Sequence, residues 1–254
     1  MYRMCVVGFA TALLLAGAAR PALAQEQDKE CLDLIRKAVK AQGGQEVLDK
    51  HKAVTVKTKG TVHIMGGLKY TDEVQFQFPD KFRTDIQIEA GGQTFTITQA
   101  FDGKKGWSRL GDKVMDLDEK DAAEAKALLY SGKVSNLVDL LKDKKFALSP
   151  LGETKVNDRA AAGVLVKHKG QRDVSLYFDK KSGLLTKTVE TVYDKMADKE
   201  VTQEKIFADH KVIDGQQTPH KLTITRDGEP FVDAEVTDVS FVERHDASVF
   251  AKPE

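Results

Sequence analysis

The amino-acid sequence predicts a mainly β fold of the α+β class, in which one curved sheet wraps round a few short helices. About ten segments alternate apolar and polar residues, which is typical of strands with one buried face. Few segments have helical periodicity, so helices can cover only part of the apolar strand surface. Because polar residues line the other face of nearly every strand, one curved sheet is favoured over two sheets packed on each other.

The chain begins with the features of a secretory signal peptide, which we assign to residues 1–24. Arg3 precedes an apolar run from Val6 to Ala19, and the small residues Ala22 and Ala24 predict cleavage after Ala24. The run is shorter than the roughly 20 residues that a membrane-spanning helix needs, and no later run is longer. We therefore expect an exported, soluble protein of the periplasm with no transmembrane segment.

Residues 25–254 are expected to form a single domain, because no linker or repeat divides them. The full chain has 39 Lys and Arg residues and 39 Asp and Glu residues, so loss of Arg3 and Arg20 with the signal would leave a slight negative charge. A nucleic-acid partner is not expected, since such binding needs a strong positive bias. Cys31 would then be the single remaining cysteine, and we place it on an apolar helix face.

Three helices are predicted. Leu32, Ile35 and Val39 share one stripe of a helix over residues 29–42, which Gly43 ends. A helical pair interrupts the strands later in the chain, as an amphipathic insertion between two β-rich halves. Asp118 caps the first helix of this pair, residues 119–130, and Ser135 caps the second, residues 135–143, after a break at Ser131-Gly132.

The predicted strands follow one another with short turn clusters between them. They lie within residues 53–64, 73–78, 85–89, 94–98, 163–168, 173–179, 184–193, 200–208, 220–227 and 231–242. In the last segment Val236 and Val239 have opposite phases, which predicts a bulge near Thr237 and Asp238 that bends the sheet.

The stretch FDGKKGW, residues 101–107, contains the only tryptophan of the chain and reads as a hairpin. A two-residue turn at Asp102-Gly103 would place Trp107 on the face of the threonines. A turn of odd length, with Gly106 supplying a bulge or a positive φ, would place it on the face of Phe101. We predict the odd-length turn, with Trp107 pointing inward.

Signatures of enzymes and of metal sites are missing from the sequence. The motifs GxSxG, HExxH, GxxxxGK[ST] and a dinucleotide-binding GxGxxG are absent. The histidines are scattered without the spacing of metal ligands, and the acidic stretch MDLDEKDAAE lacks the glycine and the final glutamate of a calcium loop. We expect no catalysis, no cofactor and no metal; a hydrolase is the least favoured interpretation.

Two short motifs resemble those of a known family. Pro79, Lys81, Phe82 and Arg83 match its P-x-K-F/L-R strand start, and Asp102, Gly103 and Trp107 match its D-G-x-x-x-W hairpin, which precedes the helices. The chain thus resembles the LolA/LolB-like outer-membrane lipoprotein-sorting family over roughly residues 30–250. The resemblance implies a curved antiparallel half-barrel sheet with helices packed in its concave mouth. Such a half-barrel binds lipoprotein acyl chains and passes them on without catalysis. The sequence SRLGDK after Trp107 departs from the Tyr-x-Pro-like continuation of that family's carriers.

A curved sheet of this size would enclose more apolar surface than short helices fill, so we expect acyl chains of lipids or lipoproteins, or another apolar ligand, as the partner. The alternative is a protein-interaction or sensing module of the cell envelope, with an envelope protein as partner and the cavity filled by side chains. In either role we expect a monomer. The expected cavity residues are Val74, Phe76, Phe78, Ile86, Ile88, Phe95, Ile97, Phe101 and Trp107, and the expected lid residues are Leu128, Leu129, Leu137 and Leu141.

Overall fold

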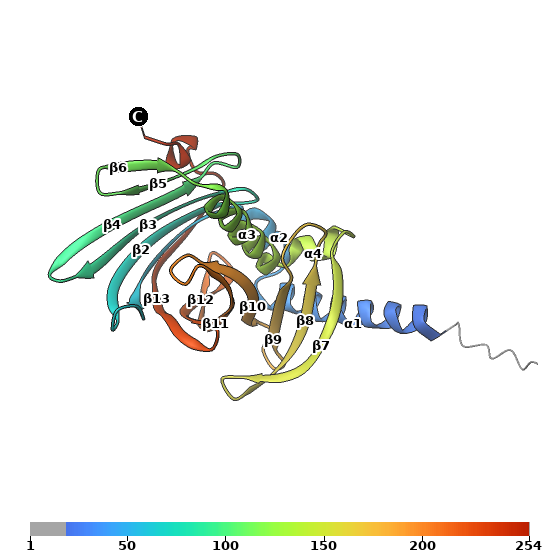
Figure 1. Cartoon of the computed structure of the whole chain (residues 1–254). Helices are drawn as coiled ribbons and strands as arrows, with labels where there is room; N and C mark the ends of the chain where they lie inside the picture. Colours follow the sequence, from blue (N-terminus) through green and yellow to red (C-terminus); the bar gives the residue numbers. More distant parts are fainter. Residues whose placement is uncertain (1–18, 254) are drawn as a thin grey trace, which may run out of the picture.

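The structure, a computed structural model, describes residues 19–253, with side chains from residue 29 onward. One open antiparallel sheet of 13 strands dominates these residues, in the order β6-β5-β4-β3-β2-β1-β13-β12-β11-β10-β9-β8-β7 (Figure 1). The mainly β half-barrel with helices in its mouth is therefore confirmed. The strands are β1 (Ala53–Val62), β2 (Leu68–Gln77), β3 (Lys81–Ala90), β4 (Gln93–Phe101), β5 (Gly106–Leu110), β6 (Lys113–Asp116), β7 (Ala147–Val156), β8 (Arg159–Lys167), β9 (Val174–Asp179), β10 (Leu185–Asp194), β11 (Lys199–Ile213), β12 (Gln216–Arg226) and β13 (Glu229–Val242).

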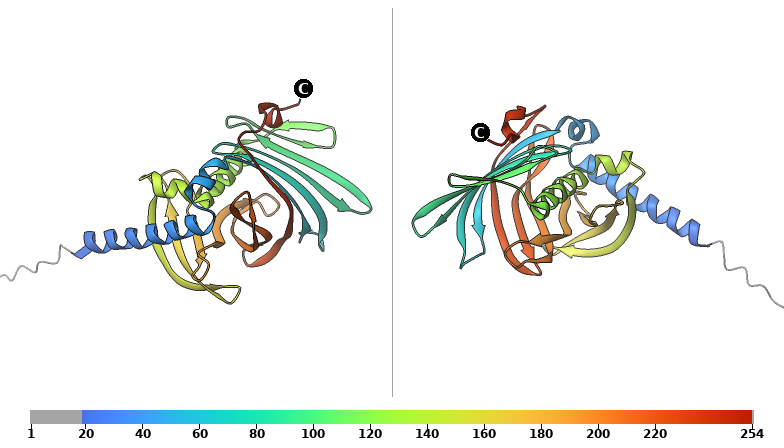
Figure 2. Two further views of the ribbon diagram at one scale, coloured as in Figure 1. Left: turned by 180° about the vertical axis from the view of Figure 1, so that it is seen from behind. Right: turned by 45° about the horizontal axis from the view of Figure 1, so that its top comes forward.

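The sheet bends into two arms, one made of β1–β6 and the other of β7–β10, which are joined through β11–β13 (Figures 1 and 2). Helix α3 (Glu119–Asn136) crosses the space between the arms. Helices α1 (Ala19–Ala41) and α4 (Val138–Lys142) cover the inner face of the second arm, and a short helix, α2 (Gln45–Lys50), follows α1. The helices therefore close one end of the concave face and leave the far part of the first arm uncovered.

Helix α1 begins earlier than the predicted residue 29 and ends where expected, next to Gly43. Residues 1–18, most of the predicted signal peptide, lie outside the described residues, and Ala19 to Ala24 form the start of α1. Cys31, Ile35 and Val39 are buried in the larger apolar core, together with residues of α4 and β7–β9. The placement of Cys31 on an apolar helix face is confirmed.

The helical pair exists, but its break lies at a different residue. Asp118 caps α3 as predicted, with its carboxylate accepting a hydrogen bond from the Asp121 N–H at 2.8 Å. The prediction of a break at Ser131-Gly132 and of a Ser135 cap was wrong, because α3 continues to Asn136. Leu137 adopts a left-handed conformation with φ of 70° and separates α3 from α4. The ring of Phe78 packs directly on Gly132 and leaves no room for a side chain there, which explains the glycine inside the helix.

Three strands were absent from the predicted ten. Strands β5 and β6 form a short hairpin at one edge of the sheet, and β7 forms the other edge. Strand β7 contains Pro150 and Gly152, and the ladder to β8 shifts register there. This interruption hides the alternation on which the prediction depended.

The predicted bulge in the last strand is confirmed. Lys57 of β1 pairs with Asp238, and the next residue, Thr58, pairs with Val236, so Thr237 is the extra residue. Its hydroxyl donates a hydrogen bond to the Lys57 carbonyl at 3.2 Å. A bulge of this kind increases the local twist of a strand pair.

The prediction for Trp107 was wrong in register. Phe101 pairs with Gly106, which leaves a four-residue loop, and Trp107 pairs with Ala100 on the face opposite Phe101. The Asp102 carboxylate accepts hydrogen bonds from the N–H groups of Lys104 and Lys105, both at 2.8 Å, which fixes this even-length loop. Gly106 supplies neither bulge nor positive φ; its missing side chain leaves room for Leu117.

Trp107 is nevertheless buried, with 4% of its surface exposed, because the C-terminal segment covers the outer face there. The short 3₁₀ helix η1 (Ala247–Phe250) lies near β5 and β6 (Figure 1). Trp107 Nε1 donates to the Phe250 carbonyl at 3.0 Å, and Arg83 Nη1 donates to the Val249 carbonyl at 3.1 Å. Trp107 therefore anchors the C-terminal segment and does not line the concave face.

Candidate ligand-binding face

The register of the strands determines which side chains share the concave face. Phe82 pairs with Phe101, Ile86 with Ile97 and Ile88 with Phe95, so these residues of β3 and β4 lie on one face. Val74 and Phe76 of β2 join the same face opposite Thr84 and Phe82. Helix α3 packs on this face through Ala125 and Leu129. Among the predicted cavity residues within the strands, all but Trp107 lie on the face that α3 covers in part.

Under α3 the face is a wall of phenylalanines, which we call the aromatic wall: Phe76, Phe78, Phe82 and Phe101. The rings of Phe76 and Phe78 stack with their centroids 5.6 Å apart, and those of Phe76 and Phe82 are 6.4 Å apart. Phe82 and Phe101 are 1% and 2% exposed beneath Ala125 and Leu129. A methyl group on Gly132 would lie 2.8 Å from Phe78 Cε1, so α3 touches the wall closely. The side chains fill the space here.

Beyond the reach of α3 the same face stays open; we call this part the distal apolar face. It comprises Val74, Ile86, Ile88, Phe95, Ile97 and Leu110, where Leu110 of β5 pairs with Ile97. Phe95 is 46% and Leu110 54% exposed, and the other four are partly exposed. An apolar concave surface that no part of the described chain covers is a typical ligand-binding feature.

The four predicted lid residues have different positions. Leu129 packs on the aromatic wall, whereas Leu128 is exposed. Leu137 is fully buried in the larger core, and Leu141 packs against it from α4. Leu129 is therefore the lid residue that reaches the first arm, while Leu137 and Leu141 hold α4 on the second arm.

Two adjoining clefts open at the mouth of the half-barrel, where Pro79 and Lys133 line both. One, of about 330 Å³, reaches Phe101, Leu129 and His168. The other, of about 340 Å³, reaches Phe78 and Leu48 of α2. The two clefts therefore border the aromatic wall at Phe101 and at Phe78.

The inner face of the central strands carries ion pairs among apolar residues such as Leu222 and Ile224 of β12. Lys205 Nζ lies 2.7 Å from Glu190 Oε1, with side chains 17% and 8% exposed, and Arg226 Nη1 lies 2.9 Å from Asp194 Oδ2. A charged side chain that is largely buried needs a partner of opposite charge, because leaving it unpaired costs free energy. The concave surface therefore carries paired charges on β10–β12 beside apolar residues of the same strands.

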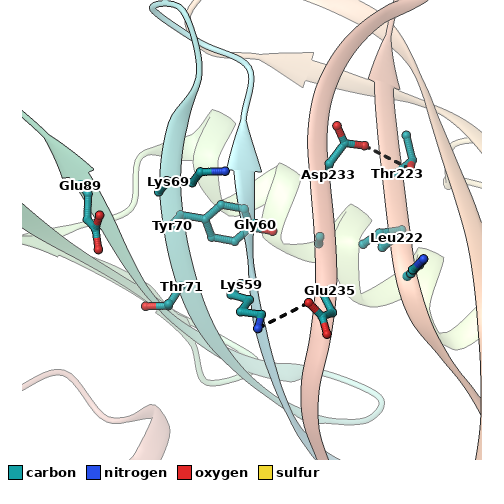
Figure 3. A pocket seen from close by; sticks show the side chains of 12 residues that line it. Lys59, Gly60, Lys69, Tyr70, Thr71, Glu89, Leu222, Thr223, Asp233 and Glu235 are labelled. Atoms are coloured by element: carbon teal, nitrogen blue, oxygen red, sulfur yellow. Dashed lines mark hydrogen bonds and ion pairs between the residues drawn. The ribbon is translucent and has the colours of Figure 1, made fainter.

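A further pocket, of about 590 Å³, surrounds Gly60 on strands β1, β2, β12 and β13 (Figure 3). The Tyr70 side chain extends from β2 toward Gly60, and Lys59 pairs with Glu235 at 3.5 Å (Figure 3). Its charged lining residues are three lysines and three acids: Lys59, Lys69, Lys221, Glu89, Asp233 and Glu235. Such a lining is that of a solvated strand surface, not of an acyl-chain site.

Several titratable groups near the concave face have shifted pKa values, and burial raises those of Asp72, Tyr70 and Tyr130. Burial raises the pKa of Asp72 on β2 to about 6. Burial also raises the pKa of Tyr130 on α3 to about 12, and its hydroxyl is buried without a hydrogen-bond partner in the described structure. Within residues 29–253, no three His, Cys, Asp or Glu side chains come together in a way that could hold a metal ion.

Several residues of the face were not among the predicted site residues. Phe82 shares the phase of Ile86 and Ile88, so extending that alternation by four residues would have found it. Leu110 could be placed on this face only with knowledge of the four-residue loop, because the loop sets the register of β5. Asp72 shares the phase of Val74 and Phe76 but is charged, and a pattern of apolar residues cannot detect it.

No protein-family model and no curated protein matches the chain. Solved structures do match it over most of its length. A LolA superfamily protein from Nitrosomonas europaea is 10% identical, with a TM-score of 0.55 over 87% of this chain and 97% of that one. An outer membrane lipoprotein-sorting protein domain from Vibrio parahaemolyticus is 13% identical, with a TM-score of 0.53 over 88% and 97%. A DUF1329 family protein from Desulfovibrio piger is 15% identical, with a TM-score of 0.56 over 89% and 97%.

At these identities the likeness shows the fold. The fold is the one indicated by the Pro79 to Arg83 and Asp102 to Trp107 motifs, so the resemblance to lipoprotein-sorting proteins is confirmed at that level. In the described part of the chain, no helix combines the length and the hydrophobicity that a membrane crossing requires.

Proposed function

We propose that the protein binds the acyl chain of a lipid or lipoprotein on its concave face and carries it without catalysis. The observation that supports this most directly is the distal apolar face, where Phe95 and Leu110 are about half exposed inside a curved sheet. The fold shared with lipoprotein-sorting proteins is consistent with such a role. The N-terminal signal pattern supports a periplasmic location, and we propose that the chain acts there as a monomer.

The energetics favour an acyl chain over a polar ligand at this face. Each methylene group removed from water contributes about 0.8 kcal/mol, so a chain of modest length gains several kcal/mol from contact with Ile86, Ile97 and Phe95 alone. The mouth clefts beside Phe78 and Phe101 provide an entry to the aromatic wall. A small displacement of α3 would join the wall to the distal apolar face and lengthen the binding surface.

Binding of a fluorescent fatty acid tests the proposal with a matched pair of variants on β4. Ile97→Glu places a charge on the distal apolar face, and Thr96→Glu places the same charge on the opposite face of the same strand. We expect the first variant to reduce binding at least tenfold and the second to bind as the unchanged protein does. Absence of binding by the unchanged protein, or equal loss in both variants, would contradict the proposal.

A protein-interaction module on the same scaffold is the second candidate, and the filled space between α3 and the aromatic wall favours it. Phe82 and Phe101 are already covered by Ala125 and Leu129, as in an ordinary core. If this candidate is right, Leu129→Asp abolishes capture of an envelope protein while fatty-acid binding is undetectable in every variant. The acyl-chain proposal expects the opposite result, measurable binding that Leu129→Asp alters.

A further inference from the structure

Asp72 is a carboxylate in the middle of the apolar concave face. It lies on β2 opposite Thr58 of β1 and Ile86 of β3, with Tyr70 and Val74 as its neighbours on the same face. The Thr84 hydroxyl donates a hydrogen bond to Asp72 Oδ1 at 2.7 Å. One hydroxyl satisfies only a fraction of the acceptor capacity of a carboxylate.

No cationic side chain compensates this charge. Among residues 29–253 Asp72 forms no ion pair, and the cations of the adjacent strands lie on the other face of the sheet. Lys57 pairs with Glu73 at 3.4 Å, and Arg83 pairs with Asp85 at 2.6 Å. The remaining titratable groups near Asp72 are Tyr70 beside it and the two acids Glu73 and Asp85, which repel its charge. Buried carboxylates in proteins are normally paired with a cation.

We propose that Asp72 binds the cationic amine of an amphipathic lipid whose acyl chain lies on the distal apolar face. This inference rests on the proposed function and adds the chemistry of the head group to it. A positively charged amine would supply the missing partner of the carboxylate, and Val74 and Ile86 on either side would contact the first methylene groups of the chain. Because the charge pair would lie in a largely apolar surrounding, it would be screened less than one in water.

The pairing depends on pH in a predictable direction. Burial and the neighbouring acids raise the pKa of Asp72 to about 6, so the carboxylate is largely protonated at pH 5 and ionised at pH 7.5. An alkylammonium stays charged over this range. Its affinity should therefore rise roughly tenfold from pH 5 to pH 7.5, whereas the affinity of an alcohol of equal length should not change.

Competition between dodecylammonium and dodecanol for a fluorescent apolar probe bound to the full chain tests the inference. At pH 7.5 we expect the unchanged protein to prefer dodecylammonium by about tenfold or more, since a buried charge pair forms with the amine alone. Asp72→Asn should remove the preference without weakening dodecanol, and Asp72→Glu should keep part of it. Glu73→Gln, one residue away on the outer face, is the matched control and should keep all of it.

Each outcome has a distinct meaning. Equal affinity of the two probes for the unchanged protein, or a preference that survives in Asp72→Asn, overturns the inference about Asp72. In both of these cases, binding of dodecanol still supports the proposed function. If neither probe binds, the proposed function fails and the inference with it. Thermal unfolding of every variant verifies that the comparison is made on folded protein.

Discussion

At the scale of single residues, Asp72 is expected to cost stability when no ligand is bound. Its carboxylate is partly buried, accepts a hydrogen bond from the Thr84 hydroxyl, and lies near the acids Glu73 and Asp85 of the other face of the sheet. A pKa of about 6 in the folded state, against 3.8 for the ordinary group, means that the folded protein holds this proton more tightly than the unfolded chain does. Protonation of Asp72 therefore stabilises the unliganded fold, and the free energy of unfolding falls as pH rises from about 4 to 6.

Asp72→Asn should consequently stabilise the unliganded protein. At pH 7.5 we expect a gain of roughly 1–3 kcal/mol in the free energy of unfolding, because the uncompensated charge is gone. At pH 4 the gain should shrink toward zero, since the carboxyl is protonated in the folded state. Urea unfolding at the two pH values measures the difference, and a loss of stability at pH 7.5 would show that the carboxylate has a cationic partner after all.

Trp107 shows where prediction from the sequence reached its limit. The hairpin itself followed from Asp102 and Gly103, but the face of the tryptophan depends on whether the loop has an odd or an even number of residues. The Asp102 side chain, by accepting from two successive N–H groups, fixes the loop at four residues. The cover over Trp107 comes from Phe250, far along the chain, and no local pattern indicates such a contact.

At the scale of elements, helix α3 has two different faces. Ala125 and Leu129 pack on the aromatic wall of the first arm. On the other side Glu124 contacts Arg172 at 2.7 Å and accepts a hydrogen bond from the Tyr193 N–H at 3.1 Å, which ties α3 to the second arm. The helix therefore bridges the arms through apolar contacts on one side and polar contacts on the other.

Glu124→Gln should loosen this bridge. The variant weakens a partly buried, charge-assisted contact, so we expect a loss of about 1–2 kcal/mol and faster amide exchange in residues 119–136. Glu119→Gln is the control, because Glu119 lies in the same helix and forms no ion pair with any described residue. Unchanged exchange in α3 would show that the apolar contacts alone hold the helix.

The C-terminal helix η1 is a second element whose role can be measured. Phe250 is fully buried, and its carbonyl accepts the Trp107 hydrogen bond. Phe250→Ala should cost about 3 kcal/mol and move the Trp107 fluorescence to longer wavelength, because the indole becomes hydrated. Val249→Ala, which keeps the backbone acceptor for Arg83, should leave the emission almost unchanged. A Trp107 spectrum that is equal in both variants would contradict the proposed cover.

At the scale of the whole molecule, the alternating strands were sufficient to predict one curved sheet, and the resemblance to the lipoprotein-sorting family placed the helices in its mouth. The pattern also identified the apolar phases of β2, β3 and β4, including Ile86, Ile97 and Phe95. It could not show which part of that face α3 covers, because this depends on the length of α3 and on the contact of Gly132 with Phe78. The pattern also could not show the paired charges of the central strands. Glu190 lies on β10 and Lys205 on β11, and their contact depends on how these two strands are aligned.

The most direct test of the account is mass spectrometry of lipid extracted from protein that was gently purified after export to the periplasm. We expect a lipid with at least one acyl chain to accompany the unchanged protein and the Thr96→Glu variant, and to be lost from Ile97→Glu. Folded, unchanged protein without any acyl lipid, or equal amounts of lipid with both variants, would contradict the claim that the distal apolar face is a binding site.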